Sequence, residues 1–208
     1  LGSRDKIINA KGLVWYPAET DVSIRPGWFY HEEENDKVKT PEKLLDIYFN
    51  SVGRNGVLLL NIPPDKEGLI NDSDIAALKK WKQLRDNIFK KNFAKNAILE
   101  SSNGINAGLI LDNNDATHFT TTGNDTTAII EIQLKTKATF NVLQLQENIR
   151  MGQRIEKFAL EYWDGKAWIM AAQGTSIGFK RLLKFSTVIA VKLRLKILSS
   201  RLNPCLAE

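Results

Sequence analysis

The sequence predicts two units of different class: an α/β unit over residues 1–95 and an all-β unit over residues 96–208. The first unit alternates short apolar runs with segments of helical period, the pattern of parallel strands joined by helices. The second has short runs of β-branched residues with turn signals and no convincing helical period, which favours a β-sandwich. No low-complexity linker separates the units, so we expect them to pack together.

The α/β unit begins with an expected strand and helix. KGLVWYP, residues 11–17, is an apolar run closed by a proline and is a candidate buried strand. TPEKLLDIYFNSVG, residues 40–53, predicts a helix, because Thr40 suits the N-cap and Pro41 the first helical position. Gly53 is a fitting signal for the end of this helix.

A second strand and helix follow in the same order. VLLLNI, residues 57–62, is a continuous apolar run closed by two prolines, which is typical of a strand buried on both faces of a parallel sheet. The next segment opens near Asp72 and carries apolar residues at helical spacing as far as Ile88, which predicts a helix.

The all-β unit is expected to contain several short strands. Asp164-Gly165, between EYW and KAW, is a hairpin turn signal. Lys192, Arg194 and Lys196 alternate with apolar residues, as on the solvated face of a half-buried strand. The expected strand segments are TTAIIEIQL, TFNVLQLQE, KFALEYWDGKAWIMAA and STVIAVKLRLKIL.

Composition excludes several classes of function. The net charge is +5 and the pI about 9.2, but the basic residues follow strand and helix faces, which argues against a nucleic-acid partner. No apolar run approaches the ~20 residues that span a bilayer, so no membrane partner is expected. The single cysteine, Cys205, excludes an intrachain disulfide and a zinc site built from several cysteines.

The segment WYPAETDVSIRPGWFYH, Trp15 to His31, concentrates aromatic rings, carboxylates and an arginine in a stretch too irregular for one regular element. If residues 11–17 form a parallel strand, Glu19 and Asp21 emerge from its carboxyl end, the end that carries active sites in α/β barrels. Asn61 emerges from the end of the next strand, so polar groups from two strands should meet at one face.

Aromatic rings beside carboxylates suit a sugar, which offers apolar C–H faces and hydroxyl groups. Glycoside cleavage needs a protonated carboxyl group to donate to the leaving oxygen. Trp15 and Trp28 could form apolar walls that raise a carboxyl pKa. Glu19 is the candidate acid and Asp21 the alternative. The open alternative is that both are solvated carboxylates of a loop.

The all-β unit contains one weak candidate for a metal site. Asp112, Asn114 and Asp115 lie close together in LDNNDATHF and carry the hard oxygen donors that Ca²⁺ prefers. Their spacing does not match an EF-hand loop, and an Asx-rich turn explains the same residues. No cofactor is expected to be required, and a structural Ca²⁺ is an open alternative.

WYPAETDVSIRPGWFYH and KTPEKLLDIYFNSVGRNGVLLLNIPPDKEGLI together resemble the late barrel region of the α-L-fucosidases of glycoside hydrolase family 29. FNVLQLQENIRMGQRIEKFALEYWDGKAW and GTSIGFKRLLKF are similar to the galactose-binding-like (discoidin-like) β-sandwich that follows the barrel in many of them. The resemblance implies the C-terminal portion of a (β/α)8-type barrel over residues 1–95 and this sandwich over residues 96–208. The PAETD form resembles the branch that acts on α-1,3 and α-1,4 linked fucose.

The resemblance also implies roles for single residues. It implies a retaining mechanism, with Glu19 as the general acid/base and with Trp28 beside the sugar. Arg25, His31 and Trp15 belong to the same motif and are implied substrate-binding residues. The Asp nucleophile of the family lies on an earlier barrel strand, which this sequence does not include.

The resemblance implies partners and a location as well. The expected substrates are fucosylated oligosaccharides or glycoconjugates, and the expected location is periplasmic or secreted. Within the same protein, the missing N-terminal part of the barrel is an expected partner, because two or three strands cannot build a barrel core. The alternatives are a non-catalytic carbohydrate-binding or adhesion module, based on the sandwich alone, and a fragment with only a structural role.

Overall fold

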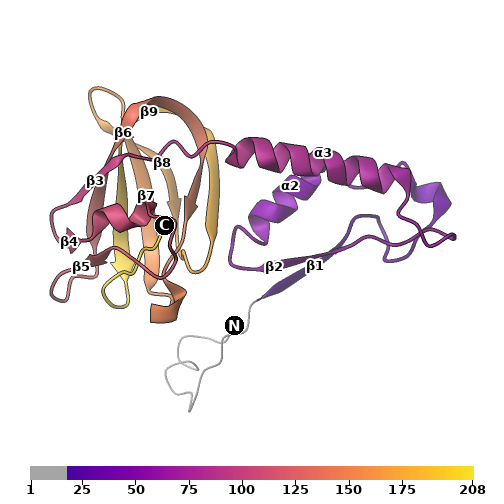
Figure 1. The fold of residues 1–208 in the computed structure, drawn as a ribbon, viewed down its shortest axis with the longest axis horizontal. Helices are drawn as coiled ribbons and strands as arrows, with labels where there is room; N and C mark the ends of the chain where they lie inside the picture. The colour runs from indigo at the N-terminus through magenta and orange to yellow at the C-terminus, as the bar shows by residue number, and fades with distance from the viewer. Residues whose placement is uncertain (1–17) are drawn as a thin grey trace, which may run out of the picture.

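The computed structural model describes residues 18–208, and the expected strand at 11–17 lies outside this range. The molecule is rich in sheet and has few helices (Figure 1). An α/β unit with one strand pair lies beside a larger β unit, and α3 runs from the far end of the first to the second. Among residues 18–208, no helix is both long and apolar enough to span a membrane.

The α/β unit is built on two parallel strands. Strand β1 (Glu19–Ser23) pairs with β2 (Val57–Asn61) in the register Glu19↔Val57 to Ser23↔Asn61. The connection between them contains the 3-10 helix η1 (Glu32–Glu34) and helix α2 (Pro41–Asn50). Parallel strands need such a crossover connection. The predicted parallel α/β pattern is therefore confirmed for the described residues.

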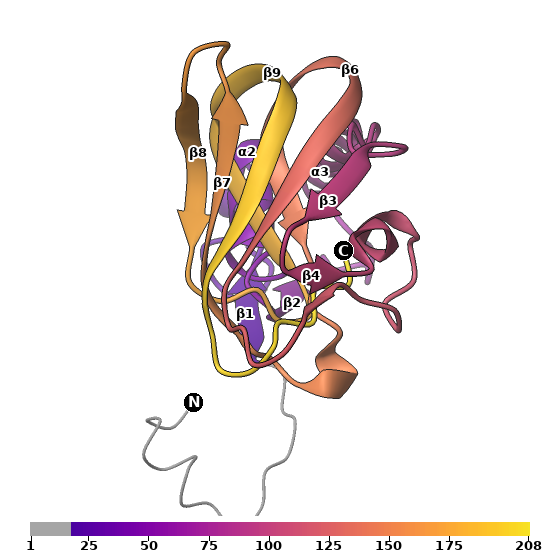
Figure 2. The same cartoon turned by 90° about the vertical axis from the view of Figure 1, so that its left-hand side faces the viewer.

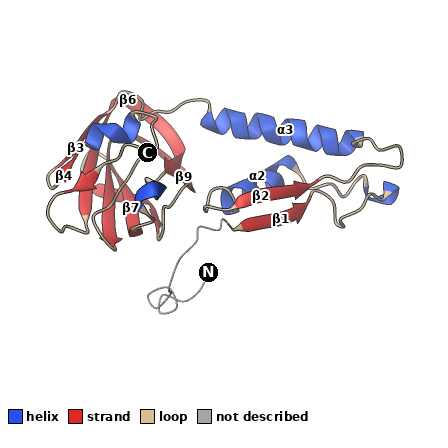
Figure 3. Ribbon diagram, turned by 60° about the horizontal axis from the view of Figure 1, so that its bottom comes forward, coloured by secondary structure: helices blue, strands red, loops and turns tan. Residues whose placement is uncertain are grey.

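The two helices begin where the sequence predicts. Thr40 caps α2 by accepting a hydrogen bond from the Lys43 backbone N–H at 3.2 Å, and Pro41 is the first helical residue. Helix α3 (Asp72–Phe89) begins at Asp72, as expected, and is capped by Asn71. Both helices lie on the same side of the strand pair, with α2 between α3 and the strands (Figure 3).

Within residues 18–208, one face of the strand pair has no cover. Val57 and Leu59 remain 46% and 55% exposed, and Glu19 and Asp21 are exposed beside them. The alternate residues of both strands, facing the helices, are half-buried. The expectation that residues 57–62 are buried on both faces is therefore wrong for the described residues, because nothing among them packs on this side.

The β unit contains a five-stranded antiparallel sheet in the order β3-β6-β9-β7-β8 (Figure 2). A short pair, β4 and β5, lies beside it. The bounds are β3 Ile98–Ser101, β4 Gly104–Ile105, β5 Thr120–Thr121, β6 Ala128–Leu145, β7 Ile155–Trp163, β8 Trp168–Gly174 and β9 Arg181–Ser200. The remaining elements are two 3-10 helices, η2 at Ala107–Leu111 and η3 at Ile149–Met151.

Strands β6 and β9 are longer than the sequence suggests. TTAIIEIQL and TFNVLQLQE, expected as separate strands, form the single strand β6. The pairing of β6 with β9 is interrupted between Gln133 and Ala138 and again between Phe140 and Val142. Such irregularities bend a strand without ending it. Sequence patterns mark these interruptions as ends of strands, although the chain continues through them.

The core of the β unit is apolar and contains two clusters of buried residues, the larger of which draws on distant segments. Phe119, Phe158 and Leu206 are fully buried in it, from segments far apart in the sequence. The predicted hairpin is confirmed: Trp163 pairs with Trp168 across the Asp164-Gly165 turn. The predicted alternation in β9 is confirmed too. Leu193, Leu195 and Ile197 are buried between more exposed basic residues.

The two units meet at the connection between α2 and β2. The Asn55 side chain accepts a hydrogen bond from the Lys180 N–H at 2.7 Å and donates one to the Ile177 carbonyl at 2.8 Å. A Cβ on Gly178, whose φ is +65°, would lie 2.7 Å from the same side chain, so only glycine fits. The expected packing of the two units is present at this contact.

Buried Glu147 holds the β-unit side of this junction. Its carboxylate accepts hydrogen bonds from the backbone N–H groups of Arg154, Ile155 and Gly178 at 2.8, 2.8 and 2.6 Å. Burial raises the pKa of Glu147, while the three N–H donors act in the opposite direction. The carboxylate therefore fixes the loop at Gly178, which in turn contacts Asn55.

Candidate functional site

The carboxyl ends of β1 and β2 meet at one edge of the strand pair. Their last residues are paired, and the Asn61 amide donates a hydrogen bond to the Ser23 hydroxyl at 3.1 Å. Ligand sites of parallel α/β folds lie at this edge. The predicted convergence of two strands is confirmed, although Ser23 takes the place expected for Glu19 and Asp21.

Arg25 lies just beyond this edge and is completely buried. Its Nε donates to Asp74 at 3.0 Å, and neither side chain is exposed to solvent. The guanidinium also lies 4.7 Å from the centre of the Tyr30 ring, in a cation–π contact. A buried ion pair of this kind requires further hydrogen bonds to offset the loss of hydration.

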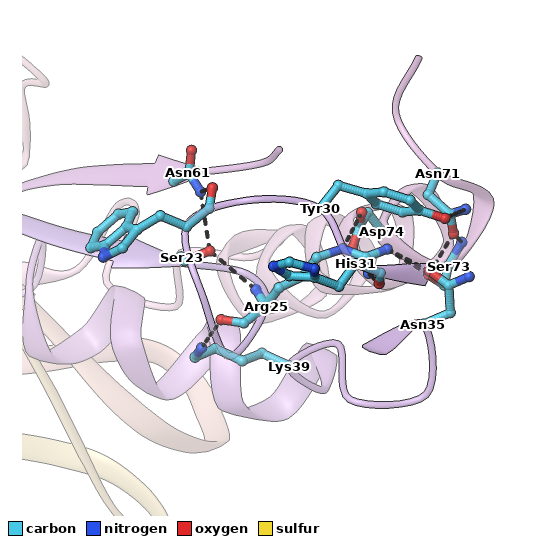
Figure 4. A network of polar contacts seen from close by, with 11 residues as sticks. Ser23, Arg25, Tyr30, His31, Asn35, Lys39, Asn61, Asn71, Ser73 and Asp74 are labelled. Carbon is cyan, nitrogen blue, oxygen red and sulfur yellow. Dashed lines mark hydrogen bonds and ion pairs between the residues drawn. The ribbon is translucent and has the colours of Figure 1, made fainter. Parts of the chain in front are cut away.

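The other nitrogens of the guanidinium supply those bonds (Figure 4). Nη1 donates to the His31 backbone carbonyl at 3.2 Å, and Nη2 donates to the side-chain oxygen of Asn35 at 2.9 Å and to the Ser73 hydroxyl at 3.4 Å. The backbone carbonyl of Arg25 accepts a hydrogen bond from Lys39 at 3.1 Å. Arg25 thus ties together both ends of the segment from residue 25 to residue 39.

Asp74 is presented by the start of helix α3. Asn71 caps this helix, and its side-chain oxygen accepts hydrogen bonds from the Ser73 N–H at 3.0 Å and the Ser73 hydroxyl at 2.7 Å. A carboxylate in the first turn is favoured by the helix dipole. The anchor of the loop therefore depends on how α3 begins, 49 residues after Arg25.

The anchored loop presents Trp28 at the carboxyl edge. The Asn61 amide donates a hydrogen bond to the Trp28 carbonyl at 2.9 Å, which fixes the backbone there. The Trp28 side chain remains 50% exposed, and the neighbouring Phe29 is more exposed still. An aromatic ring held on a rigid backbone and open to solvent can stack on the apolar face of a sugar.

The Arg25 side chain is buried and each guanidinium nitrogen has a protein partner, so its substrate-binding role stays a prediction that this arrangement does not favour. Arg25 is a positioning residue. His31 has an exposed ring, 4.0 Å from a Glu33 carboxylate oxygen, and only its carbonyl contacts Arg25. Trp15 lies outside the described residues.

Glu19 does not lie in a loop after a strand, as expected, but is the first residue of β1. At 3.3 Å per residue, it is about 13 Å from Ser23 along the strand, at the amino end of the pair. The expected location is wrong because residues 19–23 form a strand and the loop begins only after residue 23. Its acid/base role stays a prediction that this location does not favour. Asp21, exposed at the middle of β1, is not at the carboxyl edge either.

The residues of the candidate metal site form turn contacts. The Asp112 carboxylate accepts hydrogen bonds from the Asn114 N–H at 2.9 Å and the Thr117 hydroxyl at 2.7 Å. Asp115 lies 3.8 Å from Arg150. Over residues 18–208, no three His, Cys, Asp or Glu side chains are arranged to hold a metal ion. The geometry is that of an Asx turn.

The sequence analysis missed Asp74, Asn35 and Ser73 as partners of Arg25. Asp74 looks like an ordinary acidic residue in the first turn of a helix, and no local pattern distinguishes it.

Comparison with known proteins gives a consistent picture. Residues 4–84 match the sequence model of a family described as alpha-L-fucosidase. Alpha-L-fucosidase 1 of Arabidopsis thaliana is 37% identical over 206 residues, which cover 94% of this chain and 40% of the relative. The structure of a Ruminococcus gnavus glycoside hydrolase family 29 fucosidase in complex with fucose superposes with a TM-score of 0.86. It is 32% identical, over 95% of this chain and 41% of that chain.

The chain thus spans about 40% of the length of the curated relative that it matches. Both units are included in these matches, since nearly the whole chain is covered. The chain is therefore similar over nearly its whole length to α-L-fucosidases, and the family model matches residues 4–84 of it.

Proposed function

We propose that the protein containing this chain is an α-L-fucosidase that hydrolyses terminal α-L-fucosyl linkages with retention of configuration. The similarity to Arabidopsis alpha-L-fucosidase 1 over 94% of the chain carries this proposal. The PAETD motif, residues 17–21, points to α-1,3 and α-1,4 linkages in fucosylated glycans. Because the chain spans 40% of that relative, the activity belongs to a longer protein.

In this proposal the chain contributes the aromatic side of the fucose site. Trp28 is exposed at the carboxyl edge, while its backbone is held by Asn61. The ring can cover the apolar face of the sugar, and Arg25 keeps the loop in place through Asp74. Stacking of this kind needs a ring with a fixed position, since an ordered loop loses less entropy on binding.

Retaining cleavage needs two carboxyl groups about 5–5.5 Å apart. Asp74 lies at the correct edge, but its ion pair with Arg25 holds it in the interior. Glu19 lies at the opposite end of β1. We therefore take the nucleophile from the part of the protein outside this chain, and propose the same source for the proton donor.

The uncovered face of the strand pair supports a barrel completed by that other part. Val57 and Leu59 side chains at about half exposure would be covered in a closed barrel, whose interior is filled by side chains from all its strands. A carbohydrate-binding module without catalytic function is not favoured, because it leaves the family match to residues 4–84 unexplained.

The test is hydrolysis of an aryl α-L-fucoside by the protein at its full natural length, followed by NMR of the first-formed anomer. We expect α-L-fucose as the first product and turnover of α-1,3 and α-1,4 linked trisaccharides in preference to the α-1,2 linked one. Residues 1–208 alone are the control and should be inactive. Absence of turnover by the full-length protein, or first formation of the β anomer, would contradict the proposal.

A further inference from the structure

Two arginines face each other where the α/β unit meets the β unit. Arg54 and Arg181 form an isolated antiparallel bridge. It is flanked by hydrogen bonds from the Leu182 N–H to the Gly53 carbonyl at 2.9 Å and from the Asn55 N–H to the Lys180 carbonyl at 3.2 Å. This pattern makes the arginines a non-hydrogen-bonded pair, the type in which opposing side chains lie closest.

Like charges directly opposite each other destabilise a strand pair. No ion pair joins either arginine to a carboxylate within residues 18–208. Burial lowers the pKa of Arg181, and the charge of Arg54 lowers it further. Both effects indicate a cation whose charge the described residues do not compensate.

A second observation points to a missing acceptor. The Nε of Arg181 is buried and has no hydrogen-bond partner among the described residues. A buried donor without an acceptor destabilises the fold, and more so when the donor is charged. Such a group calls for an acceptor that the described residues do not supply, such as a water, an ion or another part of the protein.

We propose that Arg54 and Arg181 form a binding site for an oxyanion, which bridges the two guanidinium groups. A planar guanidinium presents two parallel N–H donors to a carboxylate, sulfate or phosphate, and two such groups can share one anion. This site lies beside the amino end of β2, since Arg54 precedes Val57 by three residues. It is therefore separate from Trp28 and does not rest on the proposed activity.

The anion would stabilise the junction between the two units. Arg54 belongs to the connection between α2 and β2, and Arg181 is the first residue of β9, so a bridging anion joins both units. Two sources share this chemistry: a free oxyanion such as sulfate, and a carboxylate side chain from the part of the protein outside this chain.

The experiment is thermal unfolding of the full-length protein in sodium sulfate and in sodium chloride of equal ionic strength. Arg54→Gln is the main variant, because Arg54 is exposed and its loss leaves no cavity. Arg181→Met is the second variant. Lys184→Gln is the matched control, since it removes one exposed charge from the same strand.

If a free oxyanion binds, saturating sulfate raises the Tm of the wild type by about 3 °C above chloride, and both arginine variants lose this increment. If a carboxylate of the protein fills the site, the wild type shows no sulfate increment, and both arginine variants melt several degrees lower while Lys184→Gln does not.

Two results would overturn the proposal. One is a sulfate increment of equal size in the wild type and in both arginine variants, which indicates a general salt effect. The other is an unchanged or raised Tm of Arg54→Gln without any sulfate increment in the wild type. The second result is expected when no anion binds, because Arg54→Gln then only removes the repulsion between two like charges.

Discussion

The two units of this chain differ in what they bury. In the β unit, apolar side chains from distant segments, such as Phe119, Phe158 and Leu206, form the larger of two core clusters. In the described part of the α/β unit, the buried apolar residues are Ile24, Leu44 and Phe49, and the largest fully buried side chain is that of Arg25. The first unit therefore relies on a buried ion pair where the second relies on apolar packing.

This difference indicates how complete each unit is. The β unit buries two apolar clusters among its own elements, whereas the α/β unit leaves Val57 and Leu59 about half exposed on one face of its strands. Exposed apolar surface on a strand pair is typical of a fold that continues elsewhere. The three variants below test this comparison, in order of decreasing expected effect.

Asp74→Asn should have the largest effect on stability. The substitution preserves shape but leaves the buried charge of Arg25 without its partner, which costs about 3–5 kcal/mol. Urea unfolding of the full-length protein measures this loss. Asp86→Asn, which removes an exposed pairing with Lys82 on the same helix, is the control and should have no measurable effect. Equal stability of Asp74→Asn and wild type would show that the ion pair does not hold the α/β unit together.

Leu59→Asp tests the uncovered face of the strand pair. If the rest of the protein covers this face, the substitution buries a carboxylate and should destabilise the full-length protein by about 2–4 kcal/mol. In residues 1–208 alone, where Leu59 is 55% exposed, the same change should have little effect. Thermal unfolding of both lengths gives the comparison. An equal response at both lengths would mean that nothing covers this face.

Glu147→Gln tests the junction on the side of the β unit. Gln keeps one acceptor oxygen but places an NH₂ group opposite the Gly178 N–H, so we expect a loss of about 1–3 kcal/mol. The lost stability is measured by urea unfolding of the full-length protein at neutral pH.

The difference in free energy of unfolding between the wild type and Glu147→Gln should also depend on pH. Burial raises the pKa of Glu147 in the folded state, so between the unfolded and the folded pKa the folded state binds more protons. The stability contributed by Glu147 is therefore greatest below its unfolded pKa and falls as pH rises through the folded pKa. The difference in free energy of unfolding between wild type and Glu147→Gln should shrink as the pH rises from the unfolded to the folded pKa. A difference that grows would show that burial does not raise the pKa of Glu147.

The sequence predicted those elements whose signals are local. The helix that starts at Pro41 has both a capping residue and a proline at its start, and the Asp164-Gly165 turn specifies its hairpin. The course of β6 could not be predicted, because its bends depend on the pairing with β9 and not on local pattern. Glu19 was misplaced because the strand was assigned to the more apolar residues before it.

The candidate site was predictable only in part. The meeting of two strand ends follows from parallel pairing, so Asn61 was expected there. The role of Arg25 depends on Asp74, 49 residues away, and a contact at that separation leaves no mark in either local sequence. An arginine that binds substrate and one that anchors a loop look the same until their burial is known.

The central claim is that the carboxyl edge of the strand pair, and not its amino end, contacts the sugar. The most direct measurement compares kcat/KM of Trp28→Ala and Glu19→Ala on an aryl α-L-fucoside, with and without azide, in the full-length protein. We expect Trp28→Ala to lose about tenfold to a hundredfold and Glu19→Ala to stay within about threefold of wild type, with no effect of azide. A slow Glu19→Ala variant that azide rescues, beside an unaffected Trp28→Ala, would contradict the account.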